Sequence, residues 1–522
     1  MPARTAALII AVVATALSGA RTHAQLAAHP TEPFLAADHW SRTALRRLAG
    51  AGAIESAAAL DAWPLRRSEV RALLAQATEH ATRLADDNAL RFARDAQRAF
   101  DAEFPAAPDA PLRAGARFLT GWIESEGGLA GGASTRAPSG AWVYGGPVPG
   151  PAAAGARLGL SADIDWRGVA GGLTAASSGD IGEAYAAVRA GPVDAWAGRR
   201  ALAFGVARGG DIVLSPAHAL DAIGIRTAQP IGLPGPLHVF GDVRATLALS
   251  RFAHSGKVRR PWFAAASVRI SPAAGFSIGL HRATLFGGAD GAQPVTAKNV
   301  VLMALGLTSQ LGKDSGFENQ VAAIDVWLRL DPGLPLVAYA ALGADDVGFS
   351  FLSTAATIVG LEAPALPGLP ELSVGIEHAR FPRSCCGHPP WYRHGDLGQG
   401  WTEEGRLLGH PLAGHGQEWA VHWDLAAGAI RWGGRVSGRT RDQENLFSPD
   451  HGGSSFGGAV HAVLHAGSST RFRVAVESER GRGWQAWSGD LGLQLRVGPA
   501  ARAPAPTRNA HADVRSCRIP AS

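Results

Sequence analysis

The chain has 522 residues, of which 46% are hydrophobic, and it carries a formal net charge of +5 at pH 7. Its basic residues, almost all arginine, are scattered singly among acidic ones, and without a basic tract we expect no nucleic acid partner. The 66 glycines interrupt long helices but suit many short strands and turns, and only three cysteines exclude a fold built on disulfides.

The N-terminus has the layout of a secretory signal peptide. Arg4 supplies an early positive charge, an apolar run extends from Ala6 to Leu17, and a small-x-small site ends at Ala24. A membrane-spanning helix needs about 20 apolar residues, more than this run provides. We therefore expect cleavage after Ala24, which makes residues 1–24 a signal peptide and the mature chain an exported protein.

Helical periodicity marks the next segment, residues 25–111. Apolar side chains recur there every three or four residues in three stretches. The expected helices are one that follows Asp38 and ends at Gly50–Gly52, one capped by Ser68, and one from Asp87 to Phe100. Prolines at 105, 108 and 111 then predict a stiff linker. The sequence thus predicts a small helical bundle and a linker, which we expect to lie in the periplasm.

From Leu112 to Val497 the polarity alternates with a period of two, which is typical of strands. The clearest stretches are Leu237–Ser250, Ala322–Leu330, Leu491–Val497, and the run after Ile430 in which Trp432 and Val436 alternate with Arg431, Arg435 and Arg439. One strand with its connection takes about 20 residues, so this span holds about 18 to 20 strands. The remaining residues, 498–522, are rich in Ala, Pro and Arg and predict a disordered tail.

A soluble β-sandwich or β-propeller would alternate in the same way. Three features favour a membrane barrel: predicted export, strands that recur from residue 112 to residue 497 without a helix, and tryptophans near strand ends, where aromatic girdles lie. The tryptophans are Trp122, Trp142, Trp166, Trp196, Trp262, Trp419 and Trp487. In lipid, only a closed sheet satisfies every backbone hydrogen bond of its strands.

We therefore expect an all-β transmembrane antiparallel β-barrel with a small N-terminal α-helical bundle. A barrel of this kind belongs in the outer membrane of a Gram-negative type cell. The expected partners are outer-membrane lipid and, during biogenesis, the barrel-assembly machinery.

Nine short segments carry a family resemblance and follow one another in the family's order. They are Leu45–Ile54, Ala62–Leu65, Gly198–Gly205, Gly210–Pro216, His281–Gly288, Phe317–Gln320 with Asp325, Trp391–His394, Gly400–Trp401 and Gly405–Leu412. In these segments the chain resembles the Wzi family of capsule-assembly outer-membrane proteins. The resemblance implies a barrel of about 18 strands. It also implies a periplasmic helical bundle and a non-enzymatic, lectin-like role that binds and anchors capsular or exopolysaccharide at the cell surface.

The run from Trp391 to His410 is the best candidate for a polysaccharide-binding site. Aromatic rings stack on the apolar C–H faces of sugars, and arginine pairs with uronic carboxylates. The candidate residues are Trp391, Tyr392, Arg393, His394, Trp401, Arg406 and His410. The same composition suits a loop packed inside the lumen for structural reasons, and this alternative stays open.

A porin or channel for small polar solutes is the alternative function. A barrel of about 18 strands is wide enough to hold an open aqueous lumen.

Metal or catalytic chemistry has little support. The spacing of Cys385, Cys386 and His388 fits no standard zinc template, so we expect no metal and no cofactor. A vicinal disulfide and a bond to Cys517 both remain open.

Glycoside hydrolysis needs two carboxyls facing one bond, whereas the neighbours in Glu403–Glu404 and Asp345–Asp346 point to opposite faces of a strand. No Gly-x-Ser-x-Gly elbow stands between a strand and a helix, although the many Ser and His residues leave a Ser/His/Asp set open. We expect no enzyme and assign no catalytic residue.

Overall fold

A computed structural model describes residues 34–35, 39–60, 63–104, 112–128, 153–166, 169–176, 181–215, 219–252, 254–255, 258–289, 295–296, 298, 318–330, 335–345, 355–383, 391–393, 401–403, 406–446, 452–466 and 470–497. The predicted signal peptide and C-terminal tail lie outside these ranges and stay predictions. No helix within the ranges is long and apolar enough to cross a membrane.

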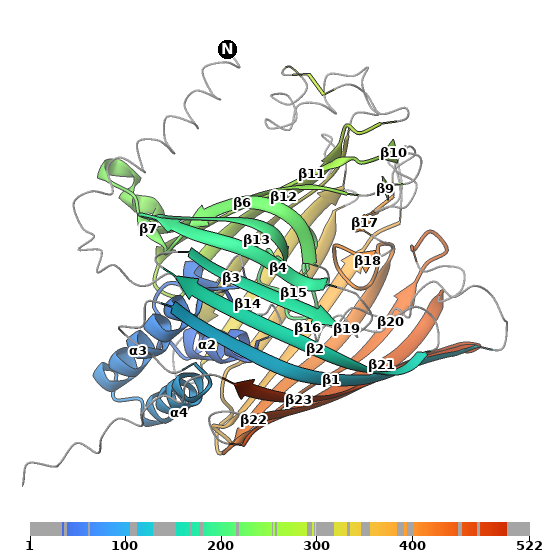
Figure 1. The fold of residues 1–522 in the computed structure, drawn as a ribbon. Coiled ribbons are helices and arrows are strands. Elements are labelled where there is room, and N and C mark those ends of the chain that lie inside the picture. Colours follow the sequence, from blue (N-terminus) through green and yellow to red (C-terminus); the bar gives the residue numbers. More distant parts are fainter. Residues whose placement is uncertain are drawn as a thin grey trace, which may run out of the picture.

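An antiparallel circuit of eighteen strands dominates the described residues (Figure 1). The main sheet has 19 strands, and the short β7 lies beside β6 along β8 instead of taking its own place in the circuit. Each of the other strands pairs with the next one along the chain. Strand β1 pairs with β2 and also with β23, where Ala116 lies opposite Val497, so the hydrogen-bonded circuit returns to its first strand.

The strands of this sheet are β1 (Leu112–Gly128), β2 (Ala153–Trp166), β3 (Val169–Ala176), β4 (Ile181–Ala190), β5 (Val193–Ala201), β6 (Ala219–Thr227), β7 (Ile231–Gly232), β8 (Asp242–Arg251), β11 (Trp262–Ala273), β12 (Phe276–Phe286), β13 (Glu318–Leu330), β14 (Leu336–Asp345), β15 (Ala356–Ala363), β16 (Leu372–Phe381), β19 (Gly416–Ala427), β20 (Ile430–Arg441), β21 (Gly453–Ala466), β22 (Thr470–Gly481) and β23 (Trp484–Val497). Two small hairpins pair β9 (His254–Ser255) with β10 (Val258–Arg259) and β17 (Thr402–Glu403) with β18 (Arg406–Leu407).

The barrel wall is apolar outside and polar inside. On β13, Ile324 and Leu328 are 42% and 37% exposed, whereas Asp325 between them is 2% exposed. On β20, Trp432 is exposed and Arg435 is buried. Lipid outside and a polar interior require this arrangement, which reverses the pattern of a soluble protein. The predicted fold class, an antiparallel membrane barrel with a small helical bundle, is confirmed.

Two expectations about the wall were wrong. Leu237 does not begin a strand, because Gly235–Phe240 forms a 3-10 helix (η4) with a proline in its first turn, and β8 begins only at Asp242. Trp196 does not belong to an outer girdle. Its ring lies inside the barrel, 4% exposed, where it fills the space beside Gly224 on the neighbouring strand.

The other tryptophans of the expected girdles divide into three groups. Trp419 is 56% exposed on the outer face of β19, as expected, and Trp262 is half-buried. Trp142 lies outside the described residues. For Trp122, Trp166 and Trp487 the description covers the backbone alone.

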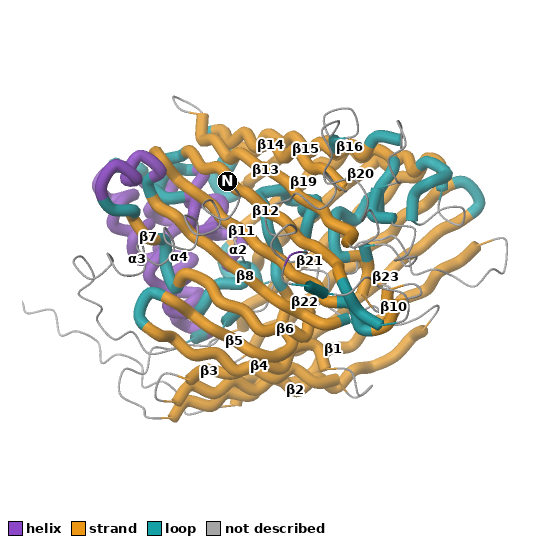
Figure 2. The backbone as a smooth tube through the Cα atoms, turned by 90° about the horizontal axis from the view of Figure 1, so that it is seen from above, coloured by secondary structure: helices purple, strands orange, loops and turns teal. Residues whose placement is uncertain are grey.

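The helices α2 (Ser41–Gly50), α3 (Arg67–Arg83) and α4 (Asp87–Glu103) gather at one end of the barrel (Figures 1 and 2). Helix α4 begins where the side chain of Asp86 accepts hydrogen bonds from two backbone N–H groups. Ser68 is not the cap of α3. The cap position is Arg66, whose backbone N–H donates to the Glu69 side chain at 2.7 Å. Helices α3 and α4 face each other through small buried alanines, which permit close packing.

The helical bundle covers the end of the barrel where strands are joined by short turns, which we call the turn end. Arg47 of α2 donates to the backbone oxygen of Glu371, in the turn from β15 to β16, at 2.8 Å. Glu103 of α4 pairs with Arg471, at the start of β22, at 3.0 Å. Longer connections, including those from β5 to β6 and from β16 to β19, lie at the opposite end, which we call the loop end.

Candidate functional site

The connection from β5 to β6 folds into the lumen, and we call its residues 202–215 the inner loop. The backbone N–H of Ala203 donates to the oxygen of Trp63, which precedes α3, at 3.0 Å. Phe204 donates to Leu214 at 2.9 Å, which closes the loop on itself. The side chain of Asp211 braces the turn by accepting from Ala207 N–H at 3.0 Å. The inner loop therefore connects the helical bundle with the middle of the lumen.

We call residues 391–412 the cap segment. Its described residues, 391–393, 401–403 and 406–412, cover the inner loop from the loop end. The Tyr392 hydroxyl donates to the backbone oxygen of Ile212 at 2.6 Å and accepts from His410 N–H at 3.0 Å. The Trp401 indole donates to the oxygen of Val213 at 2.9 Å. Buried Tyr and Trp side chains need such partners for their polar atoms, and here both partners belong to the inner loop.

Aromatic contacts fix the cap segment to the barrel wall. The Phe381 ring at the end of β16 meets Trp391 edge-on, with ring centroids 5.1 Å apart, and lies 5.4 Å from the His410 ring. Trp401 lies 5.7 Å from Phe263 of β11. Tilted and edge-on pairs of this kind add to the stabilisation that burial alone provides.

Burial sets the protonation states of two cap-segment side chains. It raises the pKa of Tyr392 well above its usual value, so the phenol remains a hydrogen-bond donor. Burial, reinforced by the nearby guanidinium groups of Arg435 and Arg439, lowers the pKa of His410 well below its usual value. A neutral His410 agrees with its Nδ1 accepting from Leu412 N–H at 3.1 Å.

The structure brings together four of the seven predicted site residues, Trp391, Tyr392, Trp401 and His410, and buries each to 2% exposure or less. Arg393 is half-buried and donates to the backbone oxygen of Asn445, in the connection from β20 to β21, at 2.8 Å. Arg406 begins β18, but its side chain is not described, and His394 lies outside the described residues. The aromatic members thus form packing contacts, and sugar binding by this segment stays a prediction.

Charged side chains that face the lumen are largely paired. Arg439 bonds to Glu418 at 2.8 Å and to Glu479 at 2.5 Å, and Arg441 bonds to Glu479 at 2.7 Å. All four are buried. A buried ion is strongly unfavourable without a partner, so removal of either member of a pair would destabilise the interior. A polar cavity of about 200 Å³ remains between α2 and the wall formed by β19 to β22.

A Ser/His/Asp set is present in the wall. The ring of His281 lies 2.9 Å from the Ser267 hydroxyl and 2.6 Å from a carboxylate oxygen of Asp325. The three side chains are 4% exposed or less, and the Phe204 ring of the inner loop stacks on the imidazole. A nucleophile must be reachable by its substrate, and this hydroxyl is covered, which favours a structural role for the set.

The other sequence candidates are only partly described. Cys385, Cys386 and Cys517, and with them the two open disulfide pairings, lie outside the described residues. Of the paired carboxylates, Glu404 and Asp346 lie outside them too, while Asp345 accepts a hydrogen bond from Tyr392 N–H. Within the described part of the chain, no three His, Cys, Asp or Glu side chains are grouped to hold a metal ion.

The sequence did not predict that the inner loop supports the cap segment. Ile212 and Val213, which supply the carbonyl acceptors, are ordinary apolar residues in the sequence. Two glycines with positive φ, Gly205 and Gly210, were the available signal for a tightly folded segment. That signal predicts a turn but not that the turn lies inside the barrel.

Comparison with known proteins identifies the family of this chain. A family model described as capsule assembly protein Wzi matches residues 100–424, more than half of the chain. Among solved structures, Escherichia coli Wzi is described as an outer membrane protein involved in group 1 capsule assembly and a carbohydrate-binding β-barrel. It is similar with a TM-score of 0.67 at 18% identity, covering 88% of this chain and 99% of that one.

Two Pseudomonas aeruginosa structures, OpdQ and OpdR, have TM-scores of 0.42 and 0.43. Their identities are 9% and 11%, each alignment covers 74% of this chain, and the alignments cover 98% and 96% of the two relatives. These scores are too low to support a functional comparison. No curated protein matches the chain.

Proposed function

The chain belongs to the Wzi family of capsule assembly proteins, and from that premise we propose that it is an outer-membrane barrel that binds capsular or exopolysaccharide and anchors it at the cell surface. The observation that carries the proposal is an apolar cluster of described residues that runs through the lumen from the helical bundle to the cap segment. Leu45 of α2, Phe204 of the inner loop and Trp401 of the cap segment belong to one continuous buried apolar cluster. A barrel filled in this way offers its loop end for binding.

The orientation of the barrel supports a surface role. In outer-membrane barrels the short turns lie on the periplasmic side and the longer loops face outward. The cap segment lies at the loop end and the helical bundle at the turn end. By this rule we propose that the cap segment faces the cell exterior and the bundle faces the periplasm.

We propose that sugar contact comes from the polar edge of the cap segment. Arg393 is half-buried, and Arg406 and His394 belong to the same segment. The planar guanidinium group matches a uronic carboxylate with two parallel hydrogen bonds. The buried Trp391, Tyr392 and Trp401 would act by holding this edge in place. We propose binding without catalysis, because Ser267 is buried, with 1% of the residue exposed.

A pull-down with the host's own extracellular polysaccharide tests the proposal. Wild type should retain the polysaccharide, and Arg406→Ala and Trp401→Ala should retain much less. Arg98→Ala, which removes an exposed arginine of α4 at the turn end, is the matched control and should bind as wild type does. Heat-modifiable electrophoretic mobility reports whether each variant is folded. A folded wild type that retains no polysaccharide contradicts the proposal.

The alternative function, a porin, is disfavoured by the same filled lumen. Planar-bilayer conductance separates the two functions, because an aqueous channel conducts ions steadily. We expect no stable open pore from the wild-type protein. A reproducible open pore would favour the channel.

A further inference from the structure

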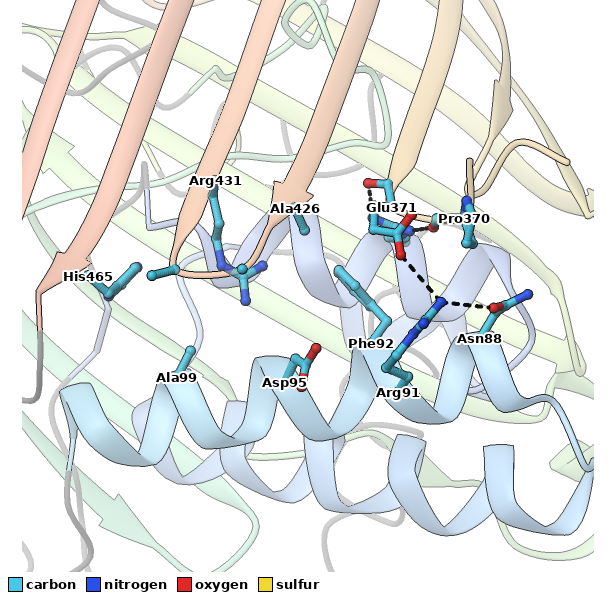
Figure 3. Close-up of a pocket in the computed structure, with 13 residues that line it drawn as sticks. Asn88, Arg91, Phe92, Asp95, Ala99, Pro370, Glu371, Ala426, Arg431 and His465 are labelled. Atoms are coloured by element: carbon cyan, nitrogen blue, oxygen red, sulfur yellow. Dashed lines mark hydrogen bonds and ion pairs between the residues drawn. The ribbon is translucent and has the colours of Figure 1, made fainter. Parts of the chain in front are cut away.

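A second cavity lies at the turn end, between helix α4 and the turns that join β15 to β16 and β19 to β20 (Figure 3). Its volume is about 180 Å³. One water molecule occupies about 30 Å³ in the liquid, so the cavity is large enough for a small organic ligand. Its rim is open to solvent, since the side chains of Arg91 and Asp95 on α4 are 59% and 51% exposed.

Arg431, at the start of β20, directs its side chain into this cavity toward α4 (Figure 3). Its guanidinium carbon lies 4.1 Å from the centroid of the Trp40 ring, and this cation–π contact holds the group in place. Among the described residues, Arg431 has neither an ion pair nor a hydrogen bond on its five N–H donors. It is therefore a fixed cation with unused donors that face a solvent-accessible space.

The other two arginines of the cavity are already engaged. Arg91 pairs with the carboxylate of Glu371 at 3.3 Å. Arg47 donates to the backbone oxygen of Glu371 at 2.8 Å and stacks on the Phe92 ring at 4.0 Å. The larger cavity beside α2 differs, because Arg208 and Arg471 there pair with carboxylates. The turn-end cavity thus contains a fixed cation whose N–H donors contact no anion of the described chain directly, while the carboxylates of Asp95 and Glu103 act on it from farther away.

The remaining lining combines hydroxyl-binding groups with apolar surface. The Nε2 atom of His465 is buried and has no hydrogen-bond partner in the described part of the chain. Asn88, Asp95 and Glu371 supply amide and carboxylate oxygens at the rim. Apolar contacts come from Phe92, Ala99, Pro370, Ala426 and Ala429. A few convergent polar groups on an apolar lining are typical of small-molecule sites.

From this arrangement we propose that the turn-end cavity binds one carboxylate-bearing sugar unit of the hexuronate class. The carboxylate accepts hydrogen bonds from the guanidinium of Arg431, and the ring hydroxyls bond to Glu371, Asp95 and His465. The inference rests on the proposed function, which supplies an acidic polysaccharide as the source of the sugar. It adds a binding site at the opposite end of the barrel from the cap segment.

Titration calorimetry on the detergent-solubilised full chain at low salt tests this site. D-glucuronate is the ligand, and D-glucose and acetate separate the sugar ring from the carboxylate. Wild type should bind glucuronate at least tenfold more tightly than either fragment. Arg431→Gln should weaken glucuronate binding at least tenfold. Arg383→Gln, which removes an exposed arginine at the loop end, is the matched control and should leave the affinity unchanged.

A second variant keeps Arg431 in place. Ala99→Leu fills the cavity from α4 with a residue that favours helix, and it should also weaken glucuronate binding at least tenfold. Unfolding temperatures equal to that of wild type establish that both variants are folded. Unchanged glucuronate affinity in either folded variant would overturn the inference, and so would acetate binding as tight as glucuronate binding, which indicates an anion site only.

The pull-down and the calorimetry together distinguish failure of this inference from failure of the proposed function. If wild type retains the host polysaccharide in the pull-down but does not bind glucuronate, this inference alone fails. If it binds neither, the proposed function fails as well.

Discussion

The stability of single buried charges depends on their partners. Asp325 accepts hydrogen bonds from Arg269 at 2.6 Å and from His281 at 2.6 Å, and all three side chains are buried. Asp325→Asn leaves a buried guanidinium without its carboxylate, so we expect the free energy of unfolding to fall by about 3–5 kcal/mol. Urea unfolding in detergent micelles, followed by tryptophan fluorescence, measures the change.

The exposed pair of Asp95 and Arg98 on α4 supplies the control for that measurement. The Arg98 side chain is 80% exposed, so Asp95→Asn should change the free energy of unfolding by less than about 1 kcal/mol. If Asp325→Asn and Asp95→Asn lowered the free energy of unfolding equally, a buried charge without its partner would cost no more than an exposed one, which contradicts this account.

Asp211 in the inner loop gives stability a pH dependence. Burial raises its pKa from 3.8 to about 7, although nearby Arg42 opposes the shift. Between about pH 4 and pH 7 the folded chain retains a proton that the unfolded chain has lost, so the free energy of unfolding falls as pH rises. For one site the slope is at most about 1.4 kcal/mol per pH unit.

Asp211→Asn removes this contribution. Urea unfolding of wild type and variant at pH 5, 6 and 7 should give a difference in unfolding free energy that shifts in favour of the variant as pH rises. A difference that stays constant across this range would show that Asp211 does not titrate there.

At the residue scale, the sequence predicts which side of the wall a strand residue faces but not what it contacts. Alternation placed Arg435 and Arg439 inside the barrel, where they are buried. It could not place Tyr392 against Ile212, because 180 positions separate them in the chain. Trp196 was misplaced because proximity to a strand end does not determine the face on which a side chain lies.

Among the structural elements, the cap segment depends on a close approach at Gly409. A Cβ atom there would lie 2.4 Å from the Tyr392 hydroxyl and 2.8 Å from the backbone oxygen of Ile212. Gly409→Val should therefore separate the cap segment from the inner loop and admit water into the lumen. Planar-bilayer recording should detect pore openings that wild type lacks.

Gly438 on β20 provides the matched control for Gly409. A Cβ at Gly438 would meet no atom within 4 Å, and valine is favoured in strands. Gly438→Val should stay as closed as wild type. Identical, closed recordings from both valine variants would contradict the role assigned to the cap segment.

Elements with strong periodicity were predictable, and irregular ones were not. The third predicted helix begins at the same residue as α4, because its apolar period and its capping aspartate act locally. The run Leu237–Phe240 alternates like a strand but forms a 3-10 helix, where prolines on either side of Gly235 restrict the backbone. The inner loop has no local pattern that predicts its course through the lumen.

For the whole molecule, the period of two and the length of the span predicted about 18 to 20 strands, and predicted export with tryptophans near strand ends favoured a membrane barrel. Filling of the lumen could not be predicted in the same way. It depends on contacts between the helical bundle, the inner loop and the cap segment, which lie far apart in the sequence. Those contacts separate a barrel with a filled lumen from an open pore of equal width.

The fate of the host's polysaccharide after deletion of this chain tests the central claim, surface anchoring, most directly. Cell-associated and released polysaccharide would be quantified separately in the wild-type and deletion strains. We predict that total production is unchanged while the polymer moves from the cell fraction to the medium. A deletion strain that retains its full coat of cell-associated polysaccharide would contradict the account.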